Sequence, residues 1–342
     1  MKIVVDDKIP YIQPALHELA DEVVLKAGSE IGPADVRDAT ILLVRTRTRC
    51  NRQLLEGSSV RLVVTATIGY DHLDTAWLDA AGIEWSNCPG CNATSVAQYV
   101  RNSLLVLQRE RGLQLHGATV GIVGVGHVGT AVAQTLSAIG CRLLLNDPLR
   151  EADGMAAPDG LAWSTLSCLQ AEADIITFHT PLTTAGSHPT LHMANAAFFG
   201  ALQRKPVIIN AARGGVVDEA ALLQAMDEGR VSDAVIDTWE GEPAINSQLL
   251  RRAIIATPHI AGYSADGKAN ATRMTLERVC RFLGKSMVFT VEVPALTAAR
   301  PWSSDPVERA LQLYDPRTDS ENLKKEPEKF EWWRGHYPLR RE

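Results

Sequence analysis

Residues 119–130 read TVGIVGVGHVGT, and this stretch decides the fold of the longer half of the chain. Gly124, Gly126 and Gly129 fit the pattern G-x-G-x-x-G, with an apolar strand ending before them and an amphipathic helix beginning near His127. In such a turn the first glycine permits the bend, the second lets a pyrophosphate approach, and the third lets helix and strand pack closely. We therefore predict that this loop, with Val128, binds a dinucleotide at a helix N-terminus.

The next predicted strand identifies the dinucleotide. It ends in Asn146 and Asp147, eighteen residues after Gly129. A carboxylate at this place hydrogen-bonds the adenine ribose hydroxyls and repels a 2′-phosphate. The sequence therefore favours NAD over NADP. The alternative is an ordinary strand-to-helix turn that happens to hold three glycines.

Outward from this loop the chain repeats one pattern, in which short apolar runs alternate with helical segments. Two such series are present, and their strands lack the polar alternation of a half-exposed sheet, so we expect parallel sheets covered on both faces. The predicted strands are residues 3–5, 22–25, 41–44, 62–65 and 83–85 in the first series, and 120–123, 142–146, 175–178, 207–210, 234–237 and 254–256 in the second. The fold class is α/β, with two Rossmann-like, doubly wound lobes.

Long helical patterns follow each series, at residues 94–112 and 267–284. Thr94 or Ser95 is a candidate cap for the first of these helices, and Gly112 a candidate end. The two helices mark the places where one lobe passes into the other.

Composition restricts the class of protein. The chain has 342 residues and a net charge of −6, which argues against general nucleic-acid binding. Its first residues form no signal peptide, and no apolar run is long enough to span a membrane, so we expect a cytoplasmic protein with no membrane partner. Cys88 and Cys91 form a CxxC pair without a second ligand pair, and we interpret them as reduced structural thiols rather than a redox or metal site.

Polar side chains follow several strands of the second series. Thr180, Arg213, Asp237, Glu242 and His259 all come at or after carboxyl ends of strands. Because function in an open α/β sheet collects along that edge, we expect these side chains to converge. None of them alone would be informative.

Each of these residues has an alternative interpretation. A lone His259 is more often structural, but a partner carboxylate such as Glu242 fixes the tautomer of its ring and suits it to proton exchange near neutral pH. Arg213 can bind a planar carboxylate through two parallel hydrogen bonds, or lie on a surface loop. The Gly214-Gly215 pair after it lets backbone and ligand come close. Asp237 can bind the nicotinamide carboxamide, or cap a loop.

Several segments of the chain together resemble those of a known family. The segments GIVGVGHVG, HTPL, NAARGGVVDE, DTWEGEP and TPHIAGY occur in the order found in D-2-hydroxyacid dehydrogenases, and the resemblance covers roughly residues 1–285. It implies that Arg213 binds the substrate carboxylate, that His259 is the acid/base, and that Glu242 is its partner. It also implies a substrate-binding, flavodoxin-like lobe at 1–93 and 259–285, an NAD-binding Rossmann domain at 94–258, and no metal.

A narrower resemblance points to members that oxidise a phosphorylated 2-hydroxy acid. Its segments are VRTRTRCN, TATIGYDHLD, PGCNA and HIAGYSADGK, with a charged, aromatic tail. It implies a small C-terminal α+β dimerisation region at 286–342 and hence a homodimer. The residues that it adds are substrate contacts at Thr46, Thr67 and Tyr263, and NAD contacts at Asp147, Thr180, Asp237 and Gly262. Thr46 stands where that group would have serine.

A phosphorylated substrate needs more cations than Arg213. Arg45, Arg47 and Arg49 follow a core strand and can share one face of an extended segment, so Arg45 is the first candidate for the phosphate. The alternative is a solvated arginine face. Arg340 and Arg341 are weaker candidates that would reach a neighbouring subunit.

Two other functions stay open. One is a related dehydrogenase acting on glycerate, lactate or 3-phosphoglycerate. The other is a non-catalytic NAD(H)-sensing protein, although a sensor has no use for all of Arg213, Glu242 and His259.

Overall fold

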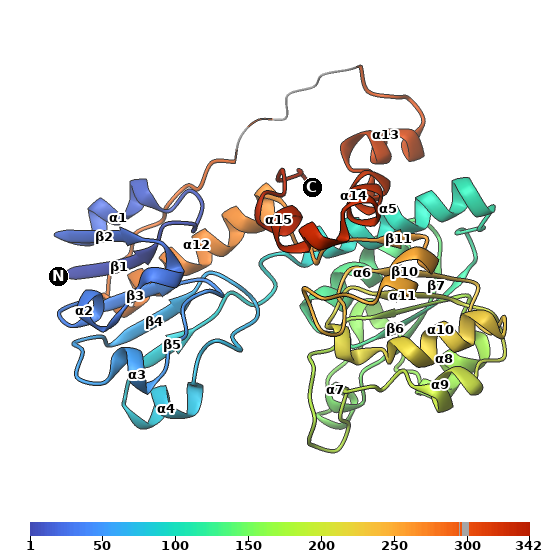
Figure 1. Cartoon of the computed structure of the whole chain (residues 1–342), viewed down its shortest axis with the longest axis horizontal. Helices are drawn as coiled ribbons and strands as arrows, with labels where there is room; N and C mark the ends of the chain where they lie inside the picture. Colours follow the sequence, from blue (N-terminus) through green and yellow to red (C-terminus); the bar gives the residue numbers. More distant parts are fainter. Residues whose placement is uncertain (294, 296–300) are drawn as a thin grey trace. The chain divides into compact units, whose positions relative to one another are not determined.

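In the computed structural model of the chain, residues 1–293, 295 and 301–342 are described, and they form two compact units (Figure 1). The first unit contains Met1–Asn92 and the segment that starts at Ser264. The second contains Ala93–Tyr263 and residues 301–342, which we call the C-terminal segment. The predicted boundaries differ from these units: Ala93, residues 259–263 and the C-terminal segment belong with the second unit, and residues 286–293 belong with the first.

The first unit is built on a five-stranded parallel sheet. Its strands are β1 (Lys2–Asp6), β2 (Glu22–Lys26), β3 (Ile41–Val44), β4 (Leu62–Thr65) and β5 (Glu84–Ser86), in the order β2-β1-β3-β4-β5. Its helices are α1 (Gln13–Leu19), α2 (Pro33–Val36), α3 (Arg52–Leu55), α4 (Thr75–Ala80) and α12 (Ala265–Phe282), with a 3-10 turn at Gly28–Glu30.

Both faces of this sheet are covered, as the continuous apolar strands predict. Ile41 and Leu43 of β3 join one buried cluster with residues of α1 and α12, whereas Leu42 and Val44 join the cluster under α2, α3 and α4. Successive side chains of a strand point to opposite faces, so an all-apolar strand fits only a sheet with two covered faces.

The second unit is built on a six-stranded parallel sheet. Its strands are β6 (Thr119–Val123), β7 (Arg142–Asn146), β8 (Ile175–Phe178), β9 (Val207–Asn210), β10 (Asp233–Ile236) and β11 (Ile255–Ala256), in the order β11-β10-β9-β8-β6-β7. The strand order reverses between β6 and β8, which is where an open α/β sheet binds its ligand.

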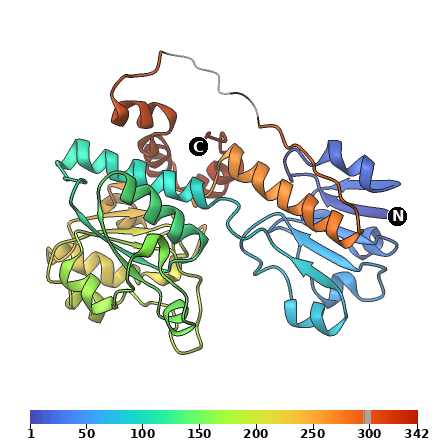
Figure 2. The ribbon, with the colours of Figure 1, turned by 180° about the vertical axis from the view of Figure 1, so that it is seen from behind.

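Helices lie on both faces of this sheet. Helices α5 (Ala93–Arg111) and α6 (His127–Ala138) run side by side on one face (Figure 2). Those that pack on the other face are α8 (Leu166–Glu172), α9 (Ala196–Gly200), α10 (Glu219–Asp227) and α11 (Ser247–Arg252). Short α7 (Pro148–Ala152) and 3-10 turns at Pro158–Gly160 and Gly214–Val216 complete the unit.

Helix α5 ends as predicted, since Gly112 adopts a positive φ of 71° directly after Arg111. Its start was predicted wrongly. The helix begins at Ala93, so Thr94 and Ser95 lie inside its first turn, and both hydroxyls contact the carboxylate of Glu342.

The C-terminal segment packs against the second unit. It contains α13 (Pro306–Leu313), α14 (Pro316–Lys325), a 3-10 turn at Pro327–Lys329 and α15 (Phe330–Gly335). Helix α14 covers the edge strand β11, where Ser320 Oγ accepts a hydrogen bond of 3.0 Å from the amide of Ala256. Within residues 301–342 the named elements are all helical, which differs from the α+β composition that the sequence suggested.

Candidate active site

The glycine turn after β6 lies at the point where the strand order reverses. Gly124 has a φ of 84°, and a Cβ there would lie 2.8 Å from Thr180 Cγ2 and 2.9 Å from the carbonyl carbon of His179. A Cβ on Gly129 would lie 2.0 Å from the carbonyl oxygen of Gly124. The first and third glycines are therefore required by the protein's own packing.

The second glycine is different, because a Cβ on Gly126 would meet no atom within 4 Å. It caps α6, whose first residues are His127 and Val128. In the same turn, Thr180 and His179 contact Gly124, and Thr180 Oγ1 and His179 Nδ1 are buried without a hydrogen-bond partner in the part of the chain that the structure describes. Open space at a helix N-terminus, in a turn that also contacts residues with unsatisfied polar atoms, fits the polar body of a dinucleotide.

Asp147 connects the glycine turn to α7. Its Oδ2 accepts a hydrogen bond of 2.9 Å from the amide of Val125, and its Oδ1 accepts one of 3.2 Å from the amide of Arg150. The carboxylate is partly exposed at the end of β7. These contacts fix it at the strand end, where the ribose contact was predicted.

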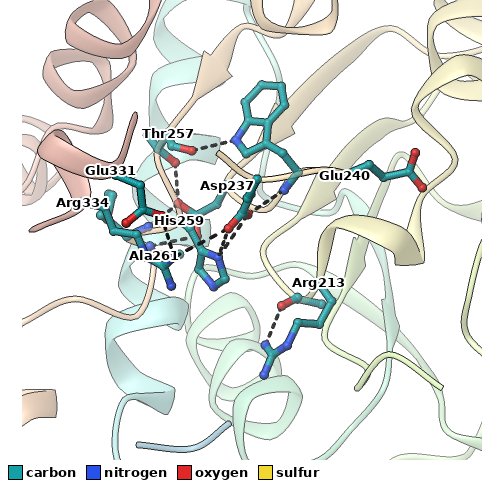
Figure 3. A network of polar contacts seen from close by, with 12 residues as sticks. Arg213, Asp237, Glu240, Thr257, His259, Ala261, Glu331 and Arg334 are labelled. Carbon is teal, nitrogen blue, oxygen red and sulfur yellow. Dashed lines mark hydrogen bonds and ion pairs between the residues drawn. The ribbon is translucent and has the colours of Figure 1, made fainter. Parts of the chain in front are cut away.

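His259, which Figure 3 labels together with Asp237 and Arg213, forms a close pair with Glu242. Glu242 Oε2 lies 2.9 Å and Oε1 lies 3.1 Å from His259 Nδ1, and Oε1 also accepts a hydrogen bond of 3.0 Å from the amide of Trp239. Burial opposes the charged carboxylate, but His259, the Trp239 amide and Arg334 outweigh it and hold the pKa of Glu242 below its usual range. An ionised Glu242 can only accept, so Nδ1 carries the proton and Nε2 is left for proton exchange.

The loop that carries His259 is held by Asp237. Asp237 Oδ1 accepts hydrogen bonds from Thr257 Oγ1 at 2.7 Å and from the amide of Ile260 at 2.8 Å. Its Oδ2 accepts one of 3.0 Å from the amide of Ala261, and only 1% of the residue is exposed. Burial raises the pKa of this carboxyl, and these hydrogen bonds oppose the rise. Of its two predicted roles, the structure displays the loop cap.

Arg213 lines one pocket with the His259–Glu242 pair. The pocket has a volume of about 410 Å³. Its other lining residues are Leu182, Gly214, Gly215, Trp239, Glu240 and Gly241. Arg213 Nη1 donates a hydrogen bond of 2.8 Å to its neighbour's carbonyl, Ala212 O. The predicted convergence of Arg213, Glu242 and His259 is therefore what the second unit displays.

The two glycines after Arg213 serve protein packing. A Cβ on Gly214 would lie 1.9 Å from the carbonyl oxygen of Trp239, and one on Gly215 would lie 3.2 Å from Leu191 Cδ1. The close approach is thus to backbone and side chains of the same unit, whereas the sequence suggested a ligand as well.

The remaining predicted contacts divide between the units. Gly262 and Tyr263 belong to the second unit, where Tyr263 Oη accepts a hydrogen bond of 3.3 Å from Arg334 Nε. Thr67 lies in the first unit, and its hydroxyl donates a hydrogen bond of 2.8 Å to the carbonyl of Gly69.

The exit of β3 carries the predicted phosphate residues. Arg45 Nη1 donates a hydrogen bond of 3.1 Å to the carbonyl of Lys8, and the next residue, Thr46, is exposed. Lys268, on α12 of the same unit, was missed from the sequence. Burial and then the nearby charge of Arg45 lower the pKa of Lys268 to about 8.

A second buried carboxyl was also missed. Glu219 is 6% exposed, and its Oε1 accepts a hydrogen bond of 2.8 Å from the amide of Glu240, in the loop that leads to Glu242. Burial first, and then the charges of Glu240 and Glu242, raise the pKa of Glu219 to about 7. The side chain of Glu240 in turn pairs with His192. From the sequence, Glu219 was predicted only as the start of a helix.

The CxxC pair has the structural character that was predicted. Both thiols are buried, and Cys88 Sγ donates to the carbonyl of Ala271 at 3.3 Å. Burial raises the pKa of Cys88 to about 11, so the thiol stays protonated at neutral pH. Across the described residues, no cluster of His, Cys, Asp or Glu is arranged to hold a metal ion.

Comparison with known proteins identifies the family. Residues 92–261 match the model "D-isomer specific 2-hydroxyacid dehydrogenase, NAD binding domain". The erythronate-4-phosphate dehydrogenase of Bacteroides thetaiotaomicron is 50% identical over 343 residues, with 100% of this chain and 97% of that protein covered. The chain belongs to the erythronate-4-phosphate dehydrogenases. As a member of this group it is an NAD-dependent oxidoreductase of the D-2-hydroxyacid dehydrogenase family.

More distant relatives agree with this assignment. The erythronate-4-phosphate dehydrogenase of Escherichia coli O127:H6 is 41% identical over 353 residues, covering 100% of this chain and 92% of that protein. The solved 3-phosphoglycerate dehydrogenase of Entamoeba histolytica, with NAD⁺ bound, has a TM-score of 0.69 at 24% identity, covering 86% of this chain and 99% of that chain. The structural likeness confirms the predicted fold of two parallel-sheet α/β lobes.

Residues 1–293 and 301–342 include no helix with both the length and the apolar character that a bilayer crossing needs.

Proposed function

We propose that this chain oxidises 4-phospho-D-erythronate to 2-oxo-3-hydroxy-4-phosphobutanoate with NAD, as a step of vitamin B6 biosynthesis. The substrate comes from the name that its relatives share. The observation that supports this chemistry is the His259–Glu242 pair in one pocket with Arg213. A base and a carboxylate-binding cation are the two groups that oxidation of a 2-hydroxy acid needs.

His259 is the proposed base. Its Nε2 takes the proton of the C2 hydroxyl while Glu242 holds Nδ1 and stabilises the imidazolium that forms. Positioned acid–base catalysis of this kind contributes roughly a hundred- to ten-thousandfold. As the O–H bond breaks, the C2–O bond becomes a carbonyl and the C2 hydrogen leaves with its electron pair. NAD, when bound, supplies the acceptor for that hydride.

Arg213 is the proposed ligand of the C1 carboxylate. Its planar guanidinium offers two parallel N–H groups, and Nη1 donates a hydrogen bond to the carbonyl of the neighbouring Ala212. Holding the carboxylate fixes C2 relative to His259, which converts a two-molecule encounter into one geometry. Tyr263 is a further proposed substrate contact in this unit, and Gly262 is a proposed NAD contact. Thr46 and Thr67 are proposed substrate contacts on the first unit.

Arg45 and Lys268 are the proposed phosphate ligands. Two cations near each other, one of them buried enough to lower its pKa to about 8, favour an anion beside them. Arg45→Ala should raise KM much more for the phosphorylated substrate than for unphosphorylated D-erythronate. Equal effects on both acids would refute the phosphate assignment.

The test of the whole proposal is NADH formation at near-stoichiometric protein, so that slow product release cannot hide the chemistry. 4-Phospho-D-erythronate, D-glycerate, D-lactate and 3-phosphoglycerate would be compared, with His259→Gln as the control. We expect NADH only with phosphoerythronate and none from the variant. NADH formation with another of these acids would show that this acid, and not 4-phospho-D-erythronate, is the substrate. NADH binding without any turnover would favour an NAD(H)-sensing protein over an enzyme. Unchanged turnover in His259→Gln would refute the assignment of His259 as the base.

A homodimer in the cytoplasm is the proposed state of the protein. Trp302 and Trp332 of the C-terminal segment are 39% and 49% exposed, which is unusual for tryptophan and suits burial against a second copy. Sedimentation velocity would show a dimer, and Trp332→Lys would shift it toward monomer. A monomer at micromolar concentration would refute this part of the proposal.

A further inference from the structure

The C-terminal segment sends one arginine into the interior of the second unit. Arg340 is 7% exposed, although arginine is almost never buried unless its donors are satisfied. Its guanidinium makes six hydrogen bonds, all to uncharged oxygen atoms. Its charge also lies 4.0 Å from the centre of the Tyr314 ring. This burial excludes the predicted role of Arg340 in a neighbouring subunit.

Three of those acceptors belong to the loop that follows His259. Arg340 Nη1 donates to the carbonyls of Ile260 at 3.1 Å and Tyr263 at 2.8 Å, and Nη2 donates to the carbonyl of Ala261 at 2.5 Å. The other bonds reach α5, at Gln98 Oε1 and the carbonyl of Ser95, and the hydroxyl of Tyr337. Arg340 thus ties the loop to the helix that borders it.

The same loop is held on its other side by an anion. Asp237 accepts hydrogen bonds from the amides of Ile260 and Ala261, while Arg340 donates hydrogen bonds to the carbonyls of these two residues. The Ile260–Ala261 peptide group therefore lies between a buried carboxylate and a buried guanidinium, which polarise it in the same sense. The peptide groups before and after it are each held on one side, by Asp237 and by Arg340 respectively.

The conformation next to this clamp needs such support. His259 has a φ of 57°, a left-handed conformation that side-chain-bearing residues seldom adopt and keep only where the surroundings enforce it. The amide of His259 donates a hydrogen bond of 2.8 Å to the carbonyl of Asp237. A looser loop would let His259 relax away from Glu242 and from the substrate hydroxyl.

We propose that Arg340 is a positioning residue for catalysis: it fixes the 260–263 backbone from the C-terminal segment and so sets the place of the His259 ring. This inference rests on the proposed role of His259 as the base. The C-terminal segment is then part of the active-site architecture of each subunit.

The test is Arg340→Lys, which keeps the positive charge but loses the planar set of N–H donors of the guanidinium. Arg317→Lys is the matched control, because Arg317 also joins the C-terminal segment to α5, through Glu110, without reaching the loop. We expect kcat of Arg340→Lys to fall at least about tenfold, since a displacement near 1 Å at a catalytic group has such an effect. The affinity for NADH and the KM for the hydroxy acid should stay within about twofold, and Arg317→Lys should match the wild type.

Hydrogen exchange provides a readout that does not depend on activity. The peptide spanning 258–263 should exchange faster in Arg340→Lys than in the wild type and in Arg317→Lys. A lower melting temperature with unchanged kcat and unchanged exchange in this peptide would overturn the proposal, because Arg340 would then only stabilise the fold.

Two further variants keep the outcome decisive. If Arg340→Lys does not fold, Tyr337→Phe removes one acceptor of Arg340 and keeps the ring, and it should show the same changes at smaller size. No change in Tyr337→Phe would then count against the clamp. His259→Gln separates the two proposals: if it keeps turnover, the base assignment fails, whereas faster exchange of the loop in Arg340→Lys would still support the clamp.

Discussion

Replacing Glu242 with glutamine tests the pair at the centre of the proposed mechanism. The substitution keeps the shape and an oxygen that accepts from His259 Nδ1, but removes the negative charge 2.9 Å away. Two unit charges with centres about 4 Å apart attract by about 4 kcal/mol at the effective dielectric of a protein surface. The remaining neutral hydrogen bond recovers about 1 kcal/mol. The transition state, in which the ring becomes charged, therefore loses about 3 kcal/mol.

A loss of about 3 kcal/mol corresponds to roughly a hundredfold lower kcat, because each 1.36 kcal/mol is a factor of ten. NADH affinity should not change, since the substitution leaves the glycine turn intact. The solvent deuterium isotope effect on kcat should increase, because proton transfer to His259 becomes the slower step. Single-turnover oxidation in water and in deuterium oxide measures both quantities.

The control is Glu172→Gln, which removes a carboxylate from the same unit, paired with Arg142 and 44% exposed. It should leave kcat unchanged. If Glu242→Gln lowers kcat less than about threefold, or lowers NADH affinity as much as kcat, the charge on Glu242 does not stabilise the transition state and the reasoning fails.

Three other substitutions give separate predictions. Gly126→Ala should fold normally, because its Cβ meets no atom within 4 Å, yet bind NADH at least about tenfold more weakly in a fluorescence titration; normal binding would contradict the cofactor site. Arg213→Lys should lower kcat/KM about a hundredfold, mainly through KM for the hydroxy acid, since an ammonium cannot replace the parallel N–H pair; an effect confined to the NADH titration would contradict it. Glu219 has its pKa raised to about 7, so the folded state holds this proton more tightly than the unfolded chain, and the stability that the proton confers is lost as pH rises from about 4.5 through 7. Urea unfolding at about pH 5 and pH 8 should show a loss of about 2–3 kcal/mol in the wild type that Glu219→Gln does not share, and equal losses would refute the shift.

Much of this fold was predictable because its strands are short, apolar and buried on both faces. Strands β3, β4, β8 and β9 lie at the predicted residues, since a short apolar run such as ILLV, bounded by polar residues, is typical of a strand buried on both faces. The predictions at element ends were less accurate. Helix α5 starts at Ala93, and the hydroxyls of Thr94 and Ser95 contact Glu342, which lies far away in sequence, instead of capping the helix.

The position of a site residue was predictable where that residue directly follows the end of a strand. Parallel strands deliver their carboxyl ends to one edge, so Arg213, Glu242 and His259 could be placed together from spacing alone. Which donor meets which acceptor was not predictable. Asp237 points into the loop after β11, and its burial became visible only when Ile260 and Ala261 were seen to turn back toward it.

The C-terminal segment shows why such contacts escape sequence reasoning. Arg340 follows a charged, aromatic stretch that indicates solvent exposure or a partner, and nothing local indicates burial. Its place depends on a flat ring at Tyr314 and on three carbonyls of a loop about eighty residues earlier. A guanidinium satisfies several carbonyls only where the chain has already brought them together, so its role is a property of the folded unit. The residues that do the proposed chemistry are set by the sheet, whereas the precision of His259 depends on a segment that lies outside the Rossmann core.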